Sequence, residues 1–270
     1  MFFLHIPIIA SLTLMCFFSG CKGRKERVER ETVYINQESA LFKTPEPVAQ
    51  TPPLYPWENR FVGSHFRISK DFFRCKGSSE NPAQHLKKNG RIIHSYNDCD
   101  GKHSLPLKEG KEFVYPCLIA LLNYIQQKCG QEVIITTGHS CVAHSGYADP
   151  SPYNYSSKHM IGAEVDFYVE NVGPEEIIAL IQQYYLDHPE YGSQKEFTEF
   201  TRYERGNLNV VTPPWQNKEI FVKHYLPDEG RDFDNQHELP YLSIQVRYDV
   251  EREERVLFKR EVAENFLYDN

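Results

Sequence analysis

The sequence predicts an α+β domain in which a small, mostly antiparallel sheet is flanked by helices. Two helix-like and four strand-like runs follow one another in the order helix, strand, strand, helix, strand, strand, which is typical of this class. The 270 residues are 40% hydrophobic and 25% charged, as in soluble domains with a sizeable core. The net charge of -7 argues against a nucleic-acid-binding protein, because such proteins cluster Lys and Arg against phosphates.

The N-terminus is set apart by a nearly uncharged apolar run that ends in small residues, so we expect a signal peptide over residues 1–20. "FSGC" resembles the lipobox of bacterial lipoproteins, although Phe18 stands where Leu is usual and no Lys or Arg precedes the run. The resemblance implies a lipid on Cys21, which would hold the protein on a membrane surface in the cell envelope. The alternative is a plain N-terminal membrane anchor.

Residues 21–56 are predicted to form a tether. They open with dense mixed charge and close with "KTPEPVAQTPPLYP", whose five prolines exclude both helix and sheet. The remaining residues, 57–270, then form one domain, since about 200 residues are of ordinary domain size.

The first regular elements of the domain are a helix and a buried strand. The helix lies in "EGKEFVYPCLIALLNYIQQKCG", with Pro116 near its start and Gly130 at its end. "QEVIITTG" follows as a β-branched strand that glycine ends. Residues 139–158 are rich in Ser, Asp, Pro, Asn and Gly and are expected to form a long loop.

The later elements complete the pattern. "GAEVDFYV" is expected to be a strand, and "GPEEIIALIQQYYLDHP" a helix with Pro174 in its first turn. "EIFVKHYL" and "PYLSIQVRYDV" are two further extended runs. The C-terminal "REERVLFKREVAENFL" is either helical or a strand that passes into a helix.

Five cysteines remain for the domain once Cys16 leaves with the signal peptide and Cys21 is lipidated. In an oxidising compartment at most two pairs can form. Cys117 and Cys129 share one predicted helix and lie about 18 Å apart by the helical rise, so they do not pair with each other. We expect Cys75 to pair with Cys99, the alternative being a fully reduced set.

"SSKHMIGAEVDF" carries the candidate site. Alternate residues of a strand share a face, so Glu164 and Asp166 point together, and a turn at Gly162 can fold His159 back over that face. A catalytic zinc site needs three protein ligands and an open position, of which His159 and Asp166 supply two. On spacing alone, a hydrogen-bonded His–Asp pair is the alternative.

The segment resembles the Ser-x-His-x-x-Gly-x-Ala-x-Asp signature of the zinc D-alanyl-D-alanine carboxypeptidases, the family shared with VanX-type dipeptidases and hedgehog-type domains. Ser157, His159, Gly162 and Asp166 fall on the motif, while Glu164 replaces its alanine. "VIITTGHSC" and "HFRISKDFFRC" also resemble family segments, and the likeness spans roughly residues 65–250. It implies a hedgehog/DD-peptidase-like fold in which His159 and Asp166 bind zinc.

The family's third ligand is a histidine in a late strand, preceded by an acidic general base. Here that strand holds Ser243 and Gln245, neither of which is a good zinc ligand. "DNQH" offers His237 three residues after Asp234, and "FVKH" offers His224. We favour His237 because an acid accompanies it, with His224 as the alternative; a third possibility is that neither is a ligand.

The resemblance implies further roles. Asp234 or Glu238 is the candidate catalytic base, and His139 or His144 could stabilise an oxyanion, with Ser157 beside the substrate. Ser140 stands where the family often has an arginine for a free carboxylate, which leaves cleavage inside a crosslink, or no cleavage.

A lipoprotein in the envelope faces peptidoglycan, so stem peptides are the implied substrate and DD- or LD-type amide hydrolysis the implied reaction. The opposing hypothesis is a metal-free binding lipoprotein of the same fold.

Overall fold

A six-stranded antiparallel sheet forms the centre of the computed structural model, which describes residues 60–149, 155–204, 208, 210–227, 229 and 239–268. Its strands run in the order β7-β8-β12-β11-β10-β9, and every pairing between neighbours is antiparallel. Their bounds are Val133–Thr137 (β7), Glu164–Val169 (β8), Thr201–Arg202 (β9), Trp215–Gln216 (β10), Ile220–Tyr225 (β11) and Tyr241–Val246 (β12). The predicted α+β class with a mostly antiparallel sheet is confirmed.

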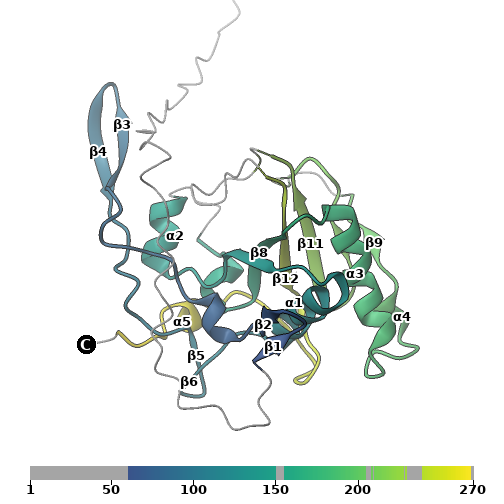
Figure 1. Ribbon diagram of the computed structural model, residues 1–270. Coiled ribbons are helices and arrows are strands. Elements are labelled where there is room, and N and C mark those ends of the chain that lie inside the picture. Colours follow the sequence, from purple (N-terminus) through teal and green to yellow (C-terminus); the bar gives the residue numbers. More distant parts are fainter. Residues whose placement is uncertain are drawn as a thin grey trace, which may run out of the picture.

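Two long helices, α1 (Pro116–Cys129) and α3 (Pro174–Asp187), pack against one face of this sheet (Figure 1). That face presents alternate residues of β8, β11 and β12, among them Phe167, Val222 and Ile244, which are buried with the apolar sides of both helices. Burial of each such side chain contributes roughly 1.5–3 kcal/mol. The main core therefore lies between the helices and the sheet.

Both long helices begin and end close to where the sequence predicts. α1 starts at Pro116, whose missing N–H is not needed in a first turn, and Gly130 follows it with a left-handed φ of 66°. α3 starts at Pro174 and carries Glu175 and Glu176 in its first turn, next to the helix's unpaired N–H groups.

The other face of the central strands is polar. Ser243 of β12 lies directly opposite Asp166 of β8, and Lys223 of β11 lies directly opposite Ser243. Gln245 and Glu164 form the next pair along the same two strands. Side chains of directly opposed residues share one face of a sheet, so these five gather over its centre.

Small elements complete the described chain. Before α1 come the strands β1 (Phe61–Val62), β2 (His65–Phe66), β3 (Gln84–Lys88), β4 (Arg91–Tyr96), β5 (Leu107–Lys108) and β6 (Lys111–Glu112), with a 3₁₀ turn, η1 (Lys70–Phe73). The later ones are the 3₁₀ turn η3 (Lys158–Ile161), the helix α4 (Lys195–Thr198), the strands β13 (Tyr248–Asp249) and β14 (Glu254–Arg255), and the helix α5 (Arg260–Ala263). The β3–β4 hairpin stands away from the rest of the molecule (Figure 1). At the C-terminus a strand passes into a helix, which is one of the two forms expected.

The expected loop over residues 139–158 contains a helix, α2 (Val142–Ala148), so that prediction was wrong for these residues. The sulfur of Cys141 caps it by accepting a hydrogen bond from the backbone N–H of His144. A tertiary contact adds to this, because His144 Nδ1 lies 2.6 Å from Asp98 Oδ1. Local turn propensity is thus overridden by contacts from another part of the chain.

Several expectations fall outside the described residues. The signal peptide, Cys21 and the tether lie within residues 1–59, and Asp234, His237 and Glu238 lie within the segment 231–238. Among the helices that the structure does describe, none has the length and apolar character needed to cross a membrane.

Candidate metal site

His159 is presented by the tight turn η3, immediately before β8. The Ser157 hydroxyl caps this turn by accepting a hydrogen bond from the His159 backbone N–H, and Gly162 ends it with a left-handed φ of 67°. A Cβ atom at Gly162 would lie 2.8 Å from the carbonyl oxygen of Phe113, so a side chain does not fit there. The chain therefore turns back at Gly162 as predicted, and the imidazole lies over the polar face of β8.

The carbonyl of Gly138 sets the orientation of this imidazole. His159 Nδ1 lies 2.7 Å from the Gly138 oxygen, and a carbonyl only accepts, so the proton of a neutral ring resides on Nδ1. Gly138 follows β7, whose pairing with β8 is irregular between Ile135 and Thr137. Such irregularities re-aim the chain, and here they accompany a carbonyl that points at the histidine. The Nε2 atom is left to face the sheet.

Two carboxylates lie close to that Nε2 atom. It lies 3.4 Å from Asp166 Oδ2 and 3.8 Å from Glu164 Oε2, and all three side chains are at least nine-tenths buried. One ligand atom from each lies within 4.8 Å of the others, a spacing that could hold a metal ion. Ligand atoms around a tetrahedral zinc ion are separated by about 3.4 Å, given zinc–ligand distances of about 2.0–2.2 Å. Nitrogen and carboxylate donors also suit zinc.

Glu164 is held in place through its second oxygen. Oε1 accepts hydrogen bonds from the Ser243 hydroxyl at 2.9 Å and from Gln245 Nε2 at 2.5 Å, and it lies 3.4 Å from Lys223 Nζ. Oε2 is the oxygen that faces His159. The strand β12 thus orients the carboxylate, an arrangement in which outer partners fix a ligand.

Burial disfavours the charged forms of the site residues, whereas their oppositely charged neighbours favour them. Removal from water disfavours an imidazolium, but the carboxylates of Glu164 and Asp166 outweigh that effect and raise the pKa of His159 to about 10. Burial likewise disfavours the Glu164 carboxylate, yet the positive charges of His159 and Lys223 lower its pKa. A lone pair on Nε2 cannot face two carboxylates unless a proton or a metal ion stands between them.

Lys223 is the second buried cation. Its ammonium group donates to the Tyr225 hydroxyl at 3.1 Å as well as facing Glu164, and its side chain is 11% exposed. Burial disfavours its charge, but Glu164 and the neighbouring tyrosine raise the pKa of Lys223 above its ordinary value. With a protonated His159, the two cations balance the two carboxylates without a metal ion.

His224 does not reach this site. It lies directly opposite Leu242 and alternates with Lys223 along β11, so its side chain is on the face that packs against the core. Residues one position apart in a strand point to opposite faces, which excludes His224 as the alternative third ligand. Its Nε2 atom has no hydrogen-bond partner within the described ranges.

His139 and His144, the residues expected to stabilise an oxyanion, are both buried. His139 is 1% exposed, and burial, together with the nearby His103 and His159, lowers its pKa to about 3. Neither of its ring nitrogens makes a hydrogen bond of ordinary geometry to a residue in the described part of the chain. His144 Nδ1 lies 2.6 Å from Asp98 Oδ1, and Ser157 caps the turn that carries His159. All three residues are therefore held in the fold by burial or by local contacts.

Ser140 makes local contacts, and so do Arg202 and Arg247, two arginines that could otherwise pair with a substrate carboxylate. The Ser140 hydroxyl lies 2.9 Å from that of Ser145 in α2. Arg247 donates to the side chain of Gln216, and the guanidinium of Arg202 lies 3.8 Å from the centre of the Trp215 ring. Neither arginine contacts the carboxylates of the candidate site in the contacts described.

Glu164 is the site residue that sequence reasoning did not assign. The alternation of the strand predicts that it shares a face with Asp166, but the signature that the segment resembles has an alanine at this position. The signal that could have identified it is the spacing of two acids on one face beside a histidine.

The expected Cys75–Cys99 disulfide is not formed. All five cysteines within the described residues are free thiols, and the sulfur atoms of Cys75 and Cys99 lie 3.7 Å apart. A disulfide brings two sulfur atoms to about 2.05 Å. The two residues are neighbours as expected, but Cys141 and His103 join them in one group.

No protein-family model matches the chain, and neither the curated proteins nor the solved structures include a significant match to it.

Proposed function

We propose that the chain is a zinc-dependent amide hydrolase of the cell envelope that acts on peptidoglycan stem peptides, as a carboxypeptidase or endopeptidase of the DD or LD type. The supporting observation is that His159 Nε2 faces Asp166 and Glu164 at 3.4 and 3.8 Å while its Nδ1 is tied to the Gly138 carbonyl. These three side chains are the proposed zinc ligands, with Glu164 in place of a third histidine.

Each residue has a defined part in this proposal. Bound zinc supplies Lewis acidity, which polarises an amide carbonyl and lowers the pKa of water toward neutrality. Gly138 holds the His159 tautomer, and Ser243 and Gln245 orient Glu164. Lys223 Nζ lies 3.4 Å from Glu164 Oε1 and can stabilise negative charge that develops on a substrate oxygen. Asp234 and Glu238 remain the proposed proton acceptors.

The substrate class rests on the N-terminal sequence and on the family resemblance. A lipid on Cys21 and a proline-rich tether would place the domain beside peptidoglycan. Since Ser140 replaces an arginine that could pair with a free carboxylate, we expect cleavage inside a crosslink in preference to removal of a terminal residue.

Zinc content and peptide release test this proposal together. The full chain should bind zinc and release stem peptides from purified peptidoglycan, while His159→Ala and Asp166→Asn should bind less zinc than the wild type and release no stem peptides. His94→Ala is the matched control, because His94 is exposed on the β3–β4 hairpin. A wild-type chain that takes up no more zinc than His159→Ala does, or that releases no peptide when loaded, would refute the hydrolase.

A second candidate is a metal-free binding protein of the same fold, which the position of Lys223 favours. Its charge, with that of a protonated His159, balances Glu164 and Asp166. This candidate predicts that the zinc-free chain sediments with peptidoglycan as well as the zinc-treated chain does. Sedimentation that depends on zinc would contradict it.

A further inference from the structure

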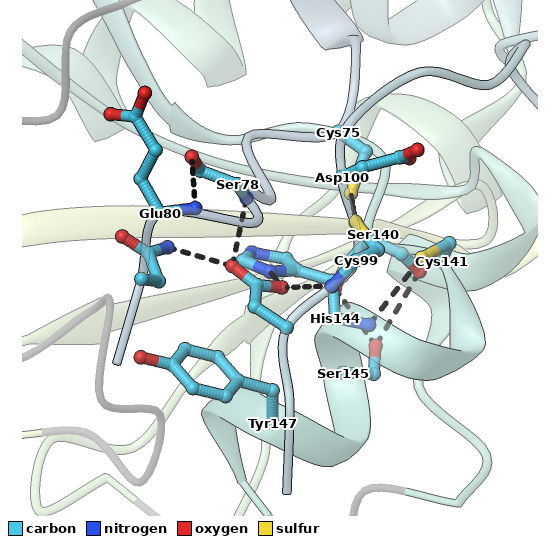
Figure 2. Close-up of polar contacts among 12 residues, drawn as sticks. Cys75, Ser78, Glu80, Cys99, Asp100, Ser140, Cys141, His144, Ser145 and Tyr147 are labelled. Carbon is cyan, nitrogen blue, oxygen red and sulfur yellow. Dashed lines mark hydrogen bonds and ion pairs between the residues drawn. The ribbon is translucent and has the colours of Figure 1, made fainter. Parts of the chain in front are cut away.

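A second group of metal-binding side chains lies apart from the proposed hydrolase centre. Three thiols and one imidazole, those of Cys75, Cys99, Cys141 and His103, converge so that one ligand atom from each lies within 4.8 Å of the others. Figure 2 shows the three cysteines brought together at the start of α2. We propose that these four residues form a structural zinc site.

The separations fit a tetrahedral ion. Zinc–sulfur bonds of about 2.3 Å place two sulfur ligands about 3.8 Å apart, and a sulfur and a nitrogen ligand about 3.6 Å apart. The sulfur atoms of Cys75 and Cys99 are 3.7 Å apart, and Cys99 Sγ is 3.8 Å from His103 Nε2. Four protein ligands leave no open position, which is the pattern of structural sites and not of catalytic ones.

The histidine has the tautomer that a zinc ligand needs. His103 Nδ1 lies 2.9 Å from the carbonyl oxygen of Ser104, so a neutral ring keeps its proton on Nδ1 and directs the lone pair of Nε2 at the thiols. Such a bond from the second ring nitrogen is the usual support for a zinc-bound histidine. The ring is 4% exposed and packs against Phe266, with centroids 4.9 Å apart.

The backbone is shaped around the sulfur atoms. A Cβ atom at Gly77 would lie 2.0 Å from Cys99 Sγ, and one at Gly101 would lie 2.4 Å from the Gly77 carbonyl oxygen. Gly101 also has a left-handed φ of 72°. Two glycine turns therefore enclose the thiols at a distance that side chains would prevent.

Asp98 lies next to the cysteine cluster, and both of its carboxylate oxygens already have hydrogen-bond partners. Its oxygens accept hydrogen bonds from the backbone N–H of Ser78 and Cys99 and from the side chain of Asn81, and Oδ1 lies 2.6 Å from His144 Nδ1. These bonds join the two cysteine-bearing loops to α2. Asp98 is therefore a positioning residue for the cluster.

The cluster lies where the fold has little regular structure to hold it. Cys75 comes after η1, Cys99 and His103 lie between β4 and β5, and Cys141 precedes α2. Residues 97–106 form no helix, and their one strand-like contact is the bridge from His103 to Tyr268. A bound ion can supply the stability that such segments do not obtain from a core.

The segments that carry Cys75 and Cys141 also contact each other next to Gly138, whose carbonyl orients His159. The Phe73 carbonyl accepts from the His139 N–H at 2.6 Å, and a Cβ atom at Gly138 would lie 2.5 Å from Phe73 Cα. Phe73 is two residues from Cys75, and Gly138 is three from Cys141. The zinc site would thus fix the carbonyl that orients His159, without taking part in the hydrolysis.

Cobalt substitution of the full chain, purified with a reductant, separates the two sites. Cobalt bound by thiolates gives intense thiolate-to-metal charge-transfer absorption in the near ultraviolet, whereas cobalt bound by His159 and carboxylates does not. We expect this absorption in the wild type, in His159→Ala and in the control Cys129→Ser, whose thiol lies on α1. Cys99→Ser should weaken cobalt binding at this site at least about 100-fold.

A rescue variant guards against a general loss of folding. His103→Ala should bind cobalt more weakly through the three remaining thiolates, while His103→Cys should bind it tightly and gain absorption intensity from a fourth thiolate, a result that a packing role for His103 does not produce. Zinc should also protect the three thiols of the wild type from alkylation, and a chelator should expose them.

Absence of the charge-transfer band in the wild type, or recovery of a Cys75–Cys99 disulfide from zinc-treated protein, would overturn the structural site. A wild type that shows the charge-transfer band but releases no stem peptides would count against the hydrolase alone.

Discussion

Ser243 on β12 lies directly across from Asp166 on β8, and its hydroxyl donates to Glu164 at 2.9 Å. The position from which an imidazole could reach the proposed zinc ion is therefore taken by a hydroxyl that orients a carboxylate ligand. This pairing makes the chemistry of the site testable by single substitutions.

Ser243→His should add a fourth protein ligand to the proposed hydrolase centre. We expect zinc affinity to rise about tenfold and peptide release to fall, because a fourth ligand closes the position that a catalytic site keeps open. Ser243→Ala, which only removes the hydrogen bond to Glu164, should lower zinc affinity about tenfold. Competition with a chromophoric chelator measures both, and equal affinities in the two variants would contradict this geometry.

Lys223→Met distinguishes the hydrolase from the metal-free binding protein. In zinc-free protein the change leaves Glu164 without its buried cation, and we expect the free energy of unfolding to fall by about 3–5 kcal/mol. In zinc-loaded protein it removes a charge that repels the ion, so zinc affinity should rise about tenfold or more. Lys195→Met is the control, since Lys195 is exposed. Equal destabilisation with and without zinc would favour the metal-free candidate.

Gly77→Ala should disrupt the cysteine cluster, because the added methyl group would meet Cys99 Sγ at 2.0 Å. We expect a loss of about 2 kcal/mol in the free energy of unfolding and at least about tenfold weaker cobalt binding. At Gly146 in α2 a Cβ atom meets nothing within 4 Å, so Gly146→Ala should stabilise the chain by about 0.5–1 kcal/mol. Chemical denaturation compares the two, and the prediction fails if both variants shift stability in the same direction.

Glu112→Gln should give a pH-dependent loss of stability. Burial disfavours the Glu112 carboxylate, but Arg74 and the Leu105 N–H outweigh it and lower its pKa. A carboxyl whose pKa is lower in the folded state stabilises the protein above its unfolded pKa of about 4.3, and this stabilisation is lost as the pH falls through the folded value.

The difference between wild type and Glu112→Gln should accordingly be about 1–2 kcal/mol at pH 7 and vanish in acid. Urea unfolding at several pH values measures it, with Glu251→Gln as a control at an exposed position. A difference that persists unchanged in acid would show that the ion pair with Arg74 is not its source.

The elements that local patterns determine were predictable from the sequence. α1 has Pro116 and Gly130 at its ends, and polar and apolar residues alternate in the first half of β8, from Glu164 to Phe167. The convergence of His159 on Asp166 was predictable for the same reason, since they are only seven positions apart, with one glycine turn between them. The β3–β4 hairpin was missed although Asn89 and Gly90, both with positive φ, are a strong hairpin signal.

What the sequence could not supply is strand register and contact between distant loops. Lys223, Ser243 and Gln245 reach Glu164 only through the pairing of β8, β12 and β11, which a single sequence does not specify. The helix α2 depends on a cysteine cap and on Asp98, about forty residues earlier in the chain, so its own residues resemble a loop.

The separation of the cysteines along the chain has a consequence for the unfolded state. Cys75 and Cys99 are 24 residues apart, and Cys141 lies farther on again. An ion shared by all of them would close large loops, and where it stays bound to the unfolded chain, closing a loop of this size removes about 3 kcal/mol of chain entropy from the unfolded ensemble. Metal loss would restore that entropy and so lower the unfolding temperature even where the folded contacts stay unchanged.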